Sequence, residues 1–408
     1  MGKRFKSPLS VHYEITQDCD NDCSHCYNPF RHEGQNIPIS VRDGILREII
    51  DNEIFHVVIT GGEPLTDKEG LFYAVEKLTR ENVKVSLNSN LNLMDEDTAT
   101  TLVGLGVDSV LTSVLHYDSK VHDEITRNPG SLESCLRGIQ IAREAGMRVS
   151  ANMVVDKERL KDVYKTGERL IPYGITGFCA TRVASHGKTE TLDSDESLFM
   201  LDELLRFQEE YSIHVASLNP IPRCLSSDPK YDVFMLRGCS AGLIGADITQ
   251  LGDMKACQHQ EETHGNILEE GLARVWEKVP ILREEVPDFC GECGECGGGC
   301  REIAGEGEVD PLAVGDFGDS EEKIKKEVDP NTNLRFYREI VHRDEGNGTG
   351  TLFRAPSNYV NLKEDQYKLS LVLAKTVFSI NGLVKEGFSP EIKRLISLLH
   401  NREIIKEA

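Results

Sequence analysis

The sequence predicts an α/β protein: a partial (β/α)6 TIM-like barrel, then a cysteine-rich domain, then a small α+β unit at the C-terminus. The barrel is predicted because strand-like and helix-like segments alternate over residues 11–220, giving six repeats of the unit. Repeated strand–helix units imply parallel strands with right-handed crossovers. The next domain is set apart by its share of the chain's twelve cysteines.

Six strand-like runs are expected to form the barrel: Val11–Thr16, Val57–Thr60, Val83–Asn88, Ser109–Leu115, Arg148–Val155 and Gly177–Val183. Between them, apolar residues recur at helical spacing, as at Ile45, Ile49 and Ile50. Asp193–Tyr211 is expected to be the last helix of this core. Because ligand chemistry in such barrels gathers at the carboxyl ends of the strands, residues there are the site candidates.

Composition divides the chain into four segments: residues 8–220 for the barrel, 221–307 for the cysteine-rich domain, 308–350 for an acidic linker and 351–408 for the C-terminal unit. In the last segment, Leu352–Arg354 and Tyr359–Leu362 are predicted to be short strands and Asp365–Ile380 a helix. Ser389 and Pro390 suit the cap and first turn of a final helix.

The net charge of −22 argues against a nucleic-acid partner, since phosphate binding needs a basic surface. The acidic surface either attracts a basic partner segment or is simply well solvated. No apolar run is long enough to span a membrane, and the basic start of the chain lacks the apolar stretch of an export signal. A cytoplasmic protein is therefore expected, in which clustered cysteines indicate metal ligation rather than disulfides.

Three cysteines directly after the first strand carry the strongest signal. Cys19, Cys23 and Cys26 stand in a C-x3-C-x2-C run. Three thiolates this close can hold three irons of a four-iron, four-sulfur cluster, because its soft irons prefer thiolate. No fourth cysteine lies nearby, so one iron would stay open to a ligand. On spacing alone, a zinc site or three buried thiols are the alternatives.

The turn that ends the second strand also points to a bound ligand. Its residues are Thr60, Gly61, Gly62, Glu63 and Pro64. Two glycines let the backbone approach a ligand closely, and the carboxylate and nearby carbonyl oxygens can accept hydrogen bonds from an amino group. On its own, such a sequence is a turn and little more.

Together, the cysteine run and the Gly-Gly-Glu-Pro turn resemble the signature of radical S-adenosylmethionine (SAM) enzymes. The resemblance implies that the three cysteines of the run ligate the cluster and that its open iron chelates SAM. Reductive cleavage of SAM would then yield a 5′-deoxyadenosyl radical. The resemblance also implies that residues 61–64 bind the amino group of SAM. His25 departs from the family, which usually has an aromatic residue there.

Later strands supply further candidates for SAM binding. The family often uses a hydroxyl in strand four to contact the ribose or carboxylate of SAM, and Ser113 lies there. Asn152 lies in strand five, and Asn90 ends strand three. Arg127 precedes a Pro-Gly-Ser turn, as in relatives where an arginine could grip the SAM carboxylate bidentately. For each residue, a packing or solvent-facing role is the alternative.

The downstream cysteines form the second strong pattern. Cys239 is followed by twelve residues, a glycine, four residues and Cys257. Four more cysteines follow, with gaps of two, two and three residues: Cys290, Cys293, Cys296 and Cys300. The pattern resembles the SPASM extension of radical SAM enzymes, which carries auxiliary four-iron clusters. The middle gap is shorter than in that extension, and no cysteine follows the last of these.

That resemblance implies two auxiliary [4Fe-4S] clusters. The ligands of the first would be Cys239, Cys257 and Cys300, with Cys224 as the candidate fourth. Those of the second would be Cys290, Cys293 and Cys296, completed by an open position or by a carboxylate: Glu302, Asp310 or Asp316. A zinc knuckle over residues 290–300 is the alternative, because the spacing of those cysteines also suits tetrahedral zinc.

Two cysteines fall outside both patterns. Cys135 lies on a predicted helix of the barrel and is expected to be buried packing. Cys179 lies in the sixth predicted strand, where it is either a core thiol or a hydrogen-atom donor to a substrate radical.

SPASM enzymes mostly act on peptides and proteins, so the resemblance implies a maturase that modifies a ribosomally made precursor peptide. The expected partners are that peptide or protein and a low-potential electron donor, flavodoxin or ferredoxin. The C-terminal unit is either a displaced winged-helix module, which binds an extended leader at its sheet edge, or a cap that packs on the barrel. In the second case, a separate protein would recognise the precursor.

Two other functions are alternatives. One is a sulfatase maturase or a small-molecule dehydrogenase that uses the same clusters. The other is an iron–sulfur electron carrier or scaffold without radical chemistry. The Gly-Gly-Glu-Pro turn argues against a carrier, which has no need of a SAM-binding turn.

Overall fold

The computed structural model describes residues 5–408 except for 29–36, 185–189, 236–237, 283–297, 305–309, 314–327, 338–339, 346–348, 355–357, 386–387, 389–391 and 403. Several predictions concern residues outside this part of the chain: Cys290, Cys293, Cys296, Asp316, Ser389 and Pro390.

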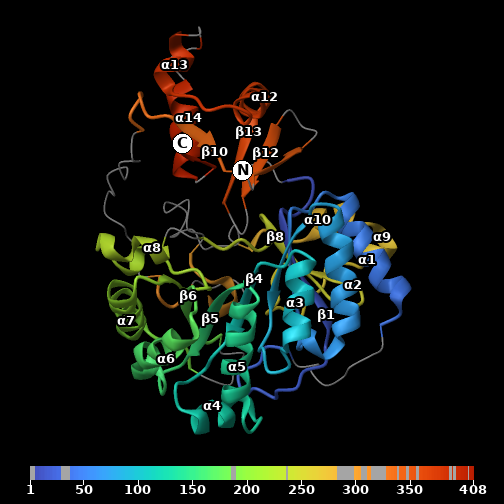
Figure 1. Cartoon of the computed structure of the whole chain (residues 1–408), viewed down its shortest axis with the longest axis vertical. Coiled ribbons are helices and arrows are strands. Elements are labelled where there is room, and N and C mark those ends of the chain that lie inside the picture. Colours follow the sequence, from blue (N-terminus) through green and yellow to red (C-terminus); the bar gives the residue numbers. More distant parts are fainter. Residues whose placement is uncertain are drawn as a thin grey trace.

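Nine strands form one sheet in the order β7-β6-β5-β4-β3-β2-β1-β8-β9 (Figure 1). Every neighbouring pair is parallel except β8 with β9. The strands are β1 Ser10–Thr16, β2 His56–Gly61, β3 Lys84–Asn88, β4 Ser109–Ser113, β5 Arg148–Val155, β6 Gly177–Arg182, β7 His214–Ala216, β8 Gly245–Ile248 and β9 Met254–Lys255. This is the predicted partial barrel.

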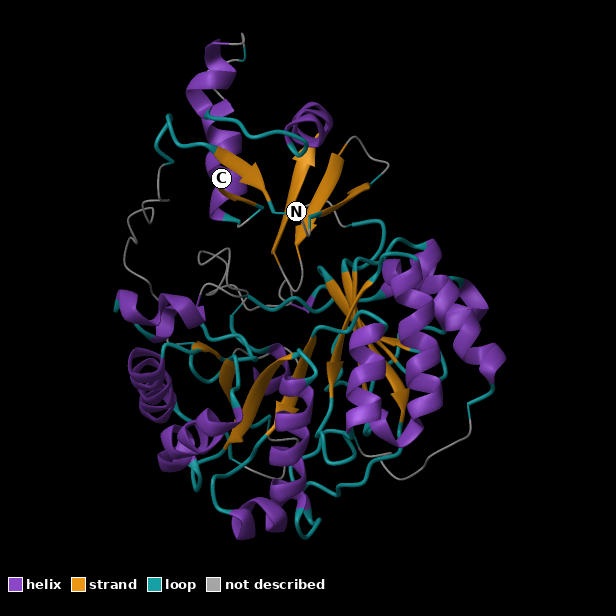
Figure 2. Ribbon diagram, viewed as in Figure 1, coloured by secondary structure: helices purple, strands orange, loops and turns teal. Residues whose placement is uncertain are grey.

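Helices cover the outer face of the sheet, as Figure 2 shows. Those of the barrel are α1 Ile39–Asp51, α2 Lys68–Arg80, α3 Glu96–Gly104, α4 Ser119–Thr126, α5 Ser131–Glu144, α6 Val163–Leu170 and α7 Ser194–Tyr211. The downstream domain adds α8 Asp232–Met235, α9 Ile267–Glu270, α10 Leu272–Lys278 and α11 Arg301–Ala304. One hydrophobic core runs through the barrel and this domain, and it includes Trp276.

Acidic side chains cap the first turn of several barrel helices. The Asp193 carboxylate accepts from the Glu196 amide at 2.9 Å, and the Glu196 carboxylate accepts from the Asp193 amide at 2.9 Å. This capping box starts α7 one residue after the predicted boundary. Asp95 caps α3 in the same way, by accepting from the Thr98 amide at 2.8 Å.

The sequence predicted the first six strands with small errors at their ends. β5 has the predicted bounds, whereas β4 stops at Ser113 rather than Leu115. β8 was not predicted, because it is only four residues long and belongs to the cysteine-rich segment. It pairs in parallel with β1, so the downstream domain extends the barrel sheet directly.

The C-terminal unit begins inside the range that was expected to be an acidic linker. Its strands are β10 Leu334–Phe336, β11 Val341–Asp344, β12 Thr349–Arg354, β13 Asn358–Lys363 and β14 Ile405–Glu407. The linker expectation for 308–350 is therefore wrong from residue 334 onward. Short strands with one buried face, such as β10, do not stand out in a polar stretch.

Three helices complete this unit: α12 Glu364–Leu373, α13 Ile380–Lys385 and α14 Ile392–Asn401. The predicted helix Asp365–Ile380 is split, because the chain leaves α12 and the backbone of Phe378 pairs with Leu334 at 2.7 and 3.0 Å. The unit has its own hydrophobic core.

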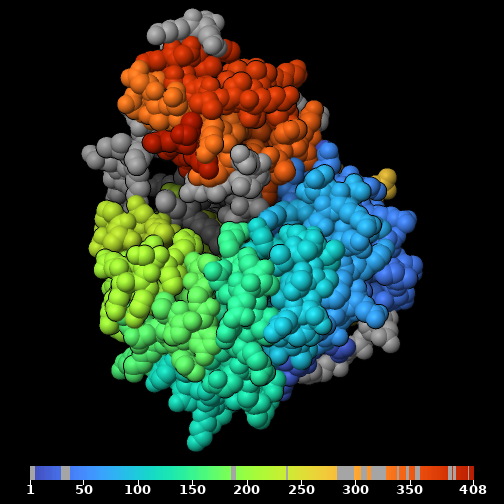
Figure 3. All heavy atoms as spheres, in the orientation of Figure 1, coloured from blue at the N-terminus to red at the C-terminus, as the bar shows by residue number. Residues whose placement is uncertain are grey.

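The C-terminal unit docks on the end of the barrel where the strands begin. The buried Arg343 guanidinium donates to the Ser7 and Pro8 carbonyls at 3.0 and 3.2 Å and pairs with Glu345 at 2.8 Å. Phe353 stacks on Phe55 with ring centroids 5.2 Å apart. In Figure 3 the orange and red unit lies over one end of the blue-to-green barrel. It packs on the barrel, but through strands rather than as a helical cap.

No helix in the described residues is both long and apolar enough to cross a membrane.

Candidate active site

The loop after β1, here called the cysteine loop, carries Cys19, Cys23 and Cys26 at the carboxyl end of the barrel. It is tied to the end of α4, because the backbone amides of Asp22 and Ser24 donate to the carbonyls of residues 126 and 125, each at 2.9 Å. Burial raises the pKa of the Cys19 thiol well above its ordinary value. A bound iron would favour the thiolate that cluster ligation requires.

Side-chain amides hold the same loop from the barrel side. The Asp20 carboxylate accepts from Asn90 Nδ2 at 2.6 Å and from Asn92 Nδ2 at 2.9 Å. Asn21 Oδ1 accepts from Asn92 Nδ2 at 3.0 Å and from Asn128 Nδ2 at 2.9 Å. Only Asn90 was singled out in the sequence. The one sequence signal for Asn92 was its place just after a strand end, where ligand-side residues gather.

The two glycines of the turn after β2 let it approach the cysteine loop. The Gly62 amide donates to the Thr16 carbonyl at 2.8 Å, and the Glu63 amide to the Asp18 carbonyl at 2.6 Å. A Cβ atom on Gly61 would lie 2.2 Å from the Thr16 carbonyl oxygen, and one on Gly62 would lie 2.1 Å from that of Asp18. The glycines were expected to admit a ligand; in this structure they admit the backbone of the loop that carries the cysteines.

Glu63 is 1 % exposed and joins the turn after β2 to the end of β3. Its carboxylate accepts from the Leu65 amide at 2.9 Å, the Ser89 hydroxyl at 2.7 Å and the Asn90 amide at 2.7 Å. Burial nevertheless raises the pKa of Glu63 to about 7. Pro64 follows at the first position of a short 3-10 helix. The carboxylate thus braces the end of β3 against the turn.

The remaining SAM-binding candidates fall into two places. Ser113 ends β4 and is the register partner of Asn152, which lies within β5, and Thr181 Oγ1 donates to Asn152 Oδ1 at 2.6 Å. Arg127 lies apart from them, after α4, in the left-handed backbone region with a φ of 53°. Its half-exposed side chain forms an ion pair with Asp22 at 2.9 Å. Arg127 therefore steadies the cysteine loop in this structure.

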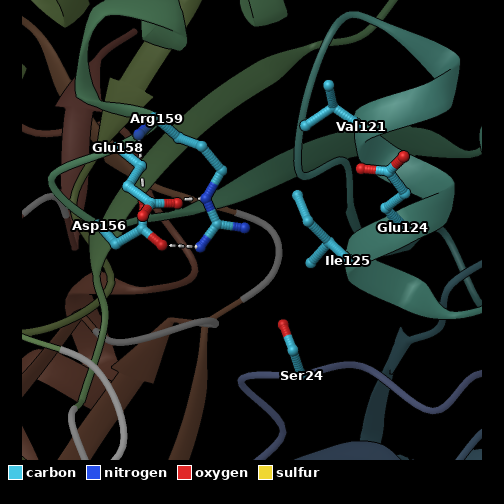
Figure 4. Close-up of a pocket in the computed structure, with 7 residues that line it drawn as sticks. All are labelled: Ser24, Val121, Glu124, Ile125, Asp156, Glu158 and Arg159. Carbon is cyan, nitrogen blue, oxygen red and sulfur yellow. Dashed lines mark hydrogen bonds and ion pairs between the residues drawn. The ribbon is translucent and has the colours of Figure 1, made fainter.

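A hollow of about 270 Å³ opens beside the cysteine loop, lined by Ser24, Val121, Glu124, Ile125, Asp156, Glu158 and Arg159 (Figure 4). Ser24 comes from the loop, three residues come from α4, and three follow β5. Arg159 Nε donates to Asp156 Oδ1 at 2.9 Å, which neutralises that carboxylate. The two glutamates leave the hollow acidic. No motif in the sequence predicts this hollow, because it forms between separate elements.

Three cysteines of the downstream pattern share one region. Burial is the main cause that raises the pKa of Cys257 well above its ordinary value. The nearby thiols of Cys300 and Cys239 raise it further. Burial raises the pKa of Cys300 to about 11. The Glu302 carboxylate also acts on Cys257. Cys224 is half-buried in a short 3-10 helix at residues 223–225.

Asp310 is unsuited to be a metal ligand, contrary to the sequence-based prediction. Both its oxygens accept from the Arg182 guanidinium, at 2.9 and 2.6 Å. They also accept from the backbone amides of Cys300 and Leu312, at 2.9 and 3.0 Å. A carboxylate has about four lone-pair sites, so all are used.

An aromatic contact joins the two cysteine regions. The Tyr27 ring, next to Cys26, lies 4.6 Å from the His259 ring, which is two residues after Cys257. Burial raises the pKa of Tyr27 well above its ordinary value, and Cys26 and Cys257 both contribute. The two regions therefore lie against each other. Sequence reasoning missed this contact, because nothing in the chain links positions so far apart.

Beside this contact, three charged side chains are buried in the barrel. Lys255 Nζ lies 3.0 Å from Glu14 Oε1 and 3.0 Å from Asp247 Oδ2. Burial, with the Glu14 carboxylate adding to it, raises the pKa of Asp247 well above its ordinary value. The group joins β1, β8 and β9, the last three strands at one end of the sheet.

The two leftover cysteines are both buried. Cys135 packs on α5 with its sulfur 3.5 Å from Thr112 Oγ1, as expected of a packing thiol. Cys179 lies in β6, and its role as a hydrogen-atom donor stays a prediction.

Comparison with known proteins distinguishes between the metal centres that the cysteine loop could form. Residues 13–170, from β1 to the end of α6, match the radical SAM superfamily. The chain contains a radical SAM domain. That membership implies a [4Fe-4S] cluster and SAM, and the thiols of the cysteine loop are the residues that fit the cluster.

Curated relatives extend beyond the radical SAM domain. An AdoMet-dependent heme synthase of Oleidesulfovibrio alaskensis is 25 % identical over 320 residues, which cover 71 % of this chain and 82 % of the relative. The PqqA peptide cyclase of Granulibacter bethesdensis is 23 % identical over 323 residues, covering 73 % and 83 %. Among solved structures, SuiB of Streptococcus suis bound to S-adenosylmethionine has a TM-score of 0.61 at 21 % identity, over 74 % of this chain and 76 % of that one. This last likeness concerns the fold.

Cys239, Cys257 and Cys300, which are half-buried and lie in one region, stay candidates for an auxiliary cluster. In the described part of the chain, no three His, Cys, Asp or Glu side chains lie close enough together to hold one metal ion. The zinc alternative over residues 290–300 falls mostly outside that part of the chain.

Proposed function

We propose that this radical SAM enzyme modifies a residue of a ribosomally made precursor peptide. Bound SAM would supply the reactive group, a 5′-deoxyadenosyl radical that removes a hydrogen atom from the peptide. The observation that carries the proposal is the contact between the cysteine loop and the downstream cysteines through Tyr27 and His259. This contact supports the proposal because it would bring the radical-generating site and an auxiliary cluster to one end of the barrel.

The protein residues would bind and position the reactants. Cys19, Cys23 and Cys26 would ligate the SAM-binding cluster, and the backbone at residues 61–64 would accept from the SAM amino group. Ser113 and Asn152, register partners on adjacent strands, are candidates for contacts with the rest of SAM. Glu63 would act by holding the turn rather than by contacting SAM, since its carboxylate already accepts three hydrogen bonds.

Two auxiliary [4Fe-4S] clusters complete the proposal. Cys239, Cys257 and Cys300 would hold the first, with Cys224 as the candidate fourth ligand. Cys290, Cys293 and Cys296 would hold the second. A low-potential flavodoxin or ferredoxin would deliver the electron for SAM cleavage, and the acidic hollow by Ser24 lies beside the loop that this donor must approach.

The C-terminal unit is the candidate precursor-binding module. Its three-stranded antiparallel sheet has the order β11-β12-β13, so β13 lies at an edge to which an extended leader could add a strand. The same unit has a groove of about 420 Å³ whose lining includes Arg335, Lys375 and Lys406. In a chain of net charge −22, this basic groove suits an acidic peptide segment. If the unit only packs on the barrel, a separate protein would present the precursor.

Heme synthesis is the second candidate, favoured by the AdoMet-dependent heme synthases among the relatives. A sulfatase maturase that uses the same clusters is a third candidate. Anaerobic turnover with an iron porphyrin, a sulfatase-derived peptide or precursor peptides encoded near the gene separates the three. Mass change in the porphyrin alone would contradict the peptide proposal.

The first test is anaerobic reconstitution with iron and sulfide, followed by reduction in the presence of SAM. Three four-iron clusters would give about twelve irons per chain. Cys23→Ala is expected to abolish 5′-deoxyadenosine formation, because one ligand of the SAM-binding cluster is lost. Cys135→Ala, which removes a buried thiol away from both cysteine regions, is the matched control and should retain it. Full 5′-deoxyadenosine formation by Cys23→Ala would contradict the assignment.

A further inference from the structure

A fully buried ion pair joins the barrel to the downstream cysteine region. Arg182 is the last residue of β6, and Asp310 lies 128 positions later in the chain. Arg182 Nη1 donates to Asp310 Oδ1 at 2.9 Å and Nη2 donates to Oδ2 at 2.6 Å, with both side chains 0 % exposed. A bidentate arginine–carboxylate pair fixes distance and orientation together.

Asp310 also holds the backbone of Cys300 in place. The Cys300 amide donates to Asp310 Oδ2 at 2.9 Å. The preceding Gly299 has a φ of +86°, and a Cβ atom on it would lie 2.6 Å from the same oxygen. Only a glycine there lets the carboxylate come so close to the cysteine backbone.

Arg182 is in turn held by the barrel side. Its Nη2 also donates to the Pro220 carbonyl at 3.3 Å, and its own carbonyl accepts from Asn219 Nδ2 at 2.9 Å. Hydrogen bonds therefore connect the end of β6 to Cys300 through the Arg182–Asp310 ion pair.

Stability alone does not account for such a pair. Taking two charges out of water offsets most of their attraction, and well-packed apolar side chains often serve as well.

We propose that Arg182 and Asp310 are positioning residues for the first auxiliary cluster, which fix Cys300 relative to the end of β6 and set the reduction potential of the cluster. The inference rests on the auxiliary cluster of the proposed function. Reduction adds negative charge to a cluster, so a nearby guanidinium favours the reduced state and a nearby carboxylate disfavours it. The two residues therefore have opposite effects on the potential, which a purely structural role would not produce.

The test measures the midpoint potentials of the auxiliary clusters by EPR-monitored redox titration. Cys19, Cys23 and Cys26 are replaced by alanine in every sample, so that the SAM-binding cluster gives no signal. Asp310→Asn leaves the guanidinium and is expected to shift one potential to more positive values. Arg182→Met leaves the carboxylate and is expected to shift the same potential to more negative values.

Arg343→Met is the matched control, because Arg343–Glu345 is an equally buried ion pair at the other end of the barrel. It should leave the potentials unchanged. If Arg182→Met does not load the cluster, Arg182→Lys keeps the charge but loses the bidentate geometry, and should load with an altered EPR signal.

Shifts of the same sign in Asp310→Asn and Arg182→Met, or none in fully loaded protein, would overturn the proposal. So would an Arg182→Lys protein whose EPR signal matches that of the parent. About four irons per chain in the natural sequence, as one cluster requires, would instead contradict the auxiliary clusters themselves.

Discussion

Ionisation of the buried Glu63 carboxylate destabilises the folded state. Burial raises its pKa from about 4.5 to about 7 on folding. The folded protein therefore binds the proton more tightly than the unfolded chain does, and the free energy of unfolding falls as the pH rises from about 4.5 to about 7. A shift of this size corresponds to about 3 kcal/mol.

Glu63→Gln is expected to remove this pH dependence, because the amide does not titrate. The free energy of unfolding of the parent, minus that of the variant, should fall by up to about 3 kcal/mol between pH 4.5 and 8. Chemical denaturation followed by the fluorescence of Trp276, the single buried tryptophan, measures it. Glu81→Gln, at an exposed carboxylate, should run parallel to the parent. Parallel curves for Glu63→Gln as well would show that Glu63 does not titrate in this range.

At the scale of residues, the sequence predicts a site when the residues that form it lie close together in the chain. Cys19, Cys23 and Cys26 lie within one loop, so their spacing, taken with the Gly-Gly-Glu-Pro turn, indicates a cluster. The contact between Tyr27 and His259 depends on how two domains pack, and no short motif encodes that. Asp310 shows the same limit, since only the folded chain reveals that Arg182 already occupies its oxygens.

At the scale of elements, the turn after β2 and the cysteine loop form one unit, because glycine lets their backbones touch. Gly62→Ala is expected to break it: the added Cβ would lie 2.1 Å from the Asp18 carbonyl oxygen, so the loop must move. We expect 5′-deoxyadenosine formation to fall at least about tenfold, as misplaced reacting groups require.

Gly104→Ala is the control for that variant, since a Cβ atom at this position in α3 meets nothing within 4 Å. It should retain the parent rate of 5′-deoxyadenosine formation and its iron content. Full activity in Gly62→Ala would mean that the close approach is dispensable.

The sequence predicts elements best where strands are long and apolar. The runs of the barrel satisfy this condition and were found nearly at their observed bounds. β8 and β10 are short, and each becomes a strand because a neighbour supplies its hydrogen-bonding partners. Such strands follow from tertiary pairing rather than from local preference.

At the scale of the molecule, Arg343 connects the C-terminal unit to the barrel end opposite the cysteine loop. Arg343→Met leaves the buried Glu345 carboxylate without its counter-ion, which is expected to cost about 3–5 kcal/mol of stability in that unit. Because the site lies at the other end, 5′-deoxyadenosine formation should stay within about twofold of the parent. Limited proteolysis and denaturant titration measure the loss.

Arg80→Met removes an exposed ion pair with Glu76 on α2 and is the matched control, expected to change stability by less than about 1 kcal/mol. Loss of SAM cleavage in Arg343→Met would show instead that the two barrel ends are coupled.

The docking of the C-terminal unit at the far end of the barrel also sets a minimum length for a substrate that binds to this unit. The seven residues of β1 span about 23 Å between the two ends. A precursor gripped at the C-terminal unit must bridge at least that distance before its reacting residue meets the cysteine loop. An extended tether of about seven residues is the minimum, and a path around the barrel wall lengthens it. Precursors with shorter spacers would be bound but left unmodified.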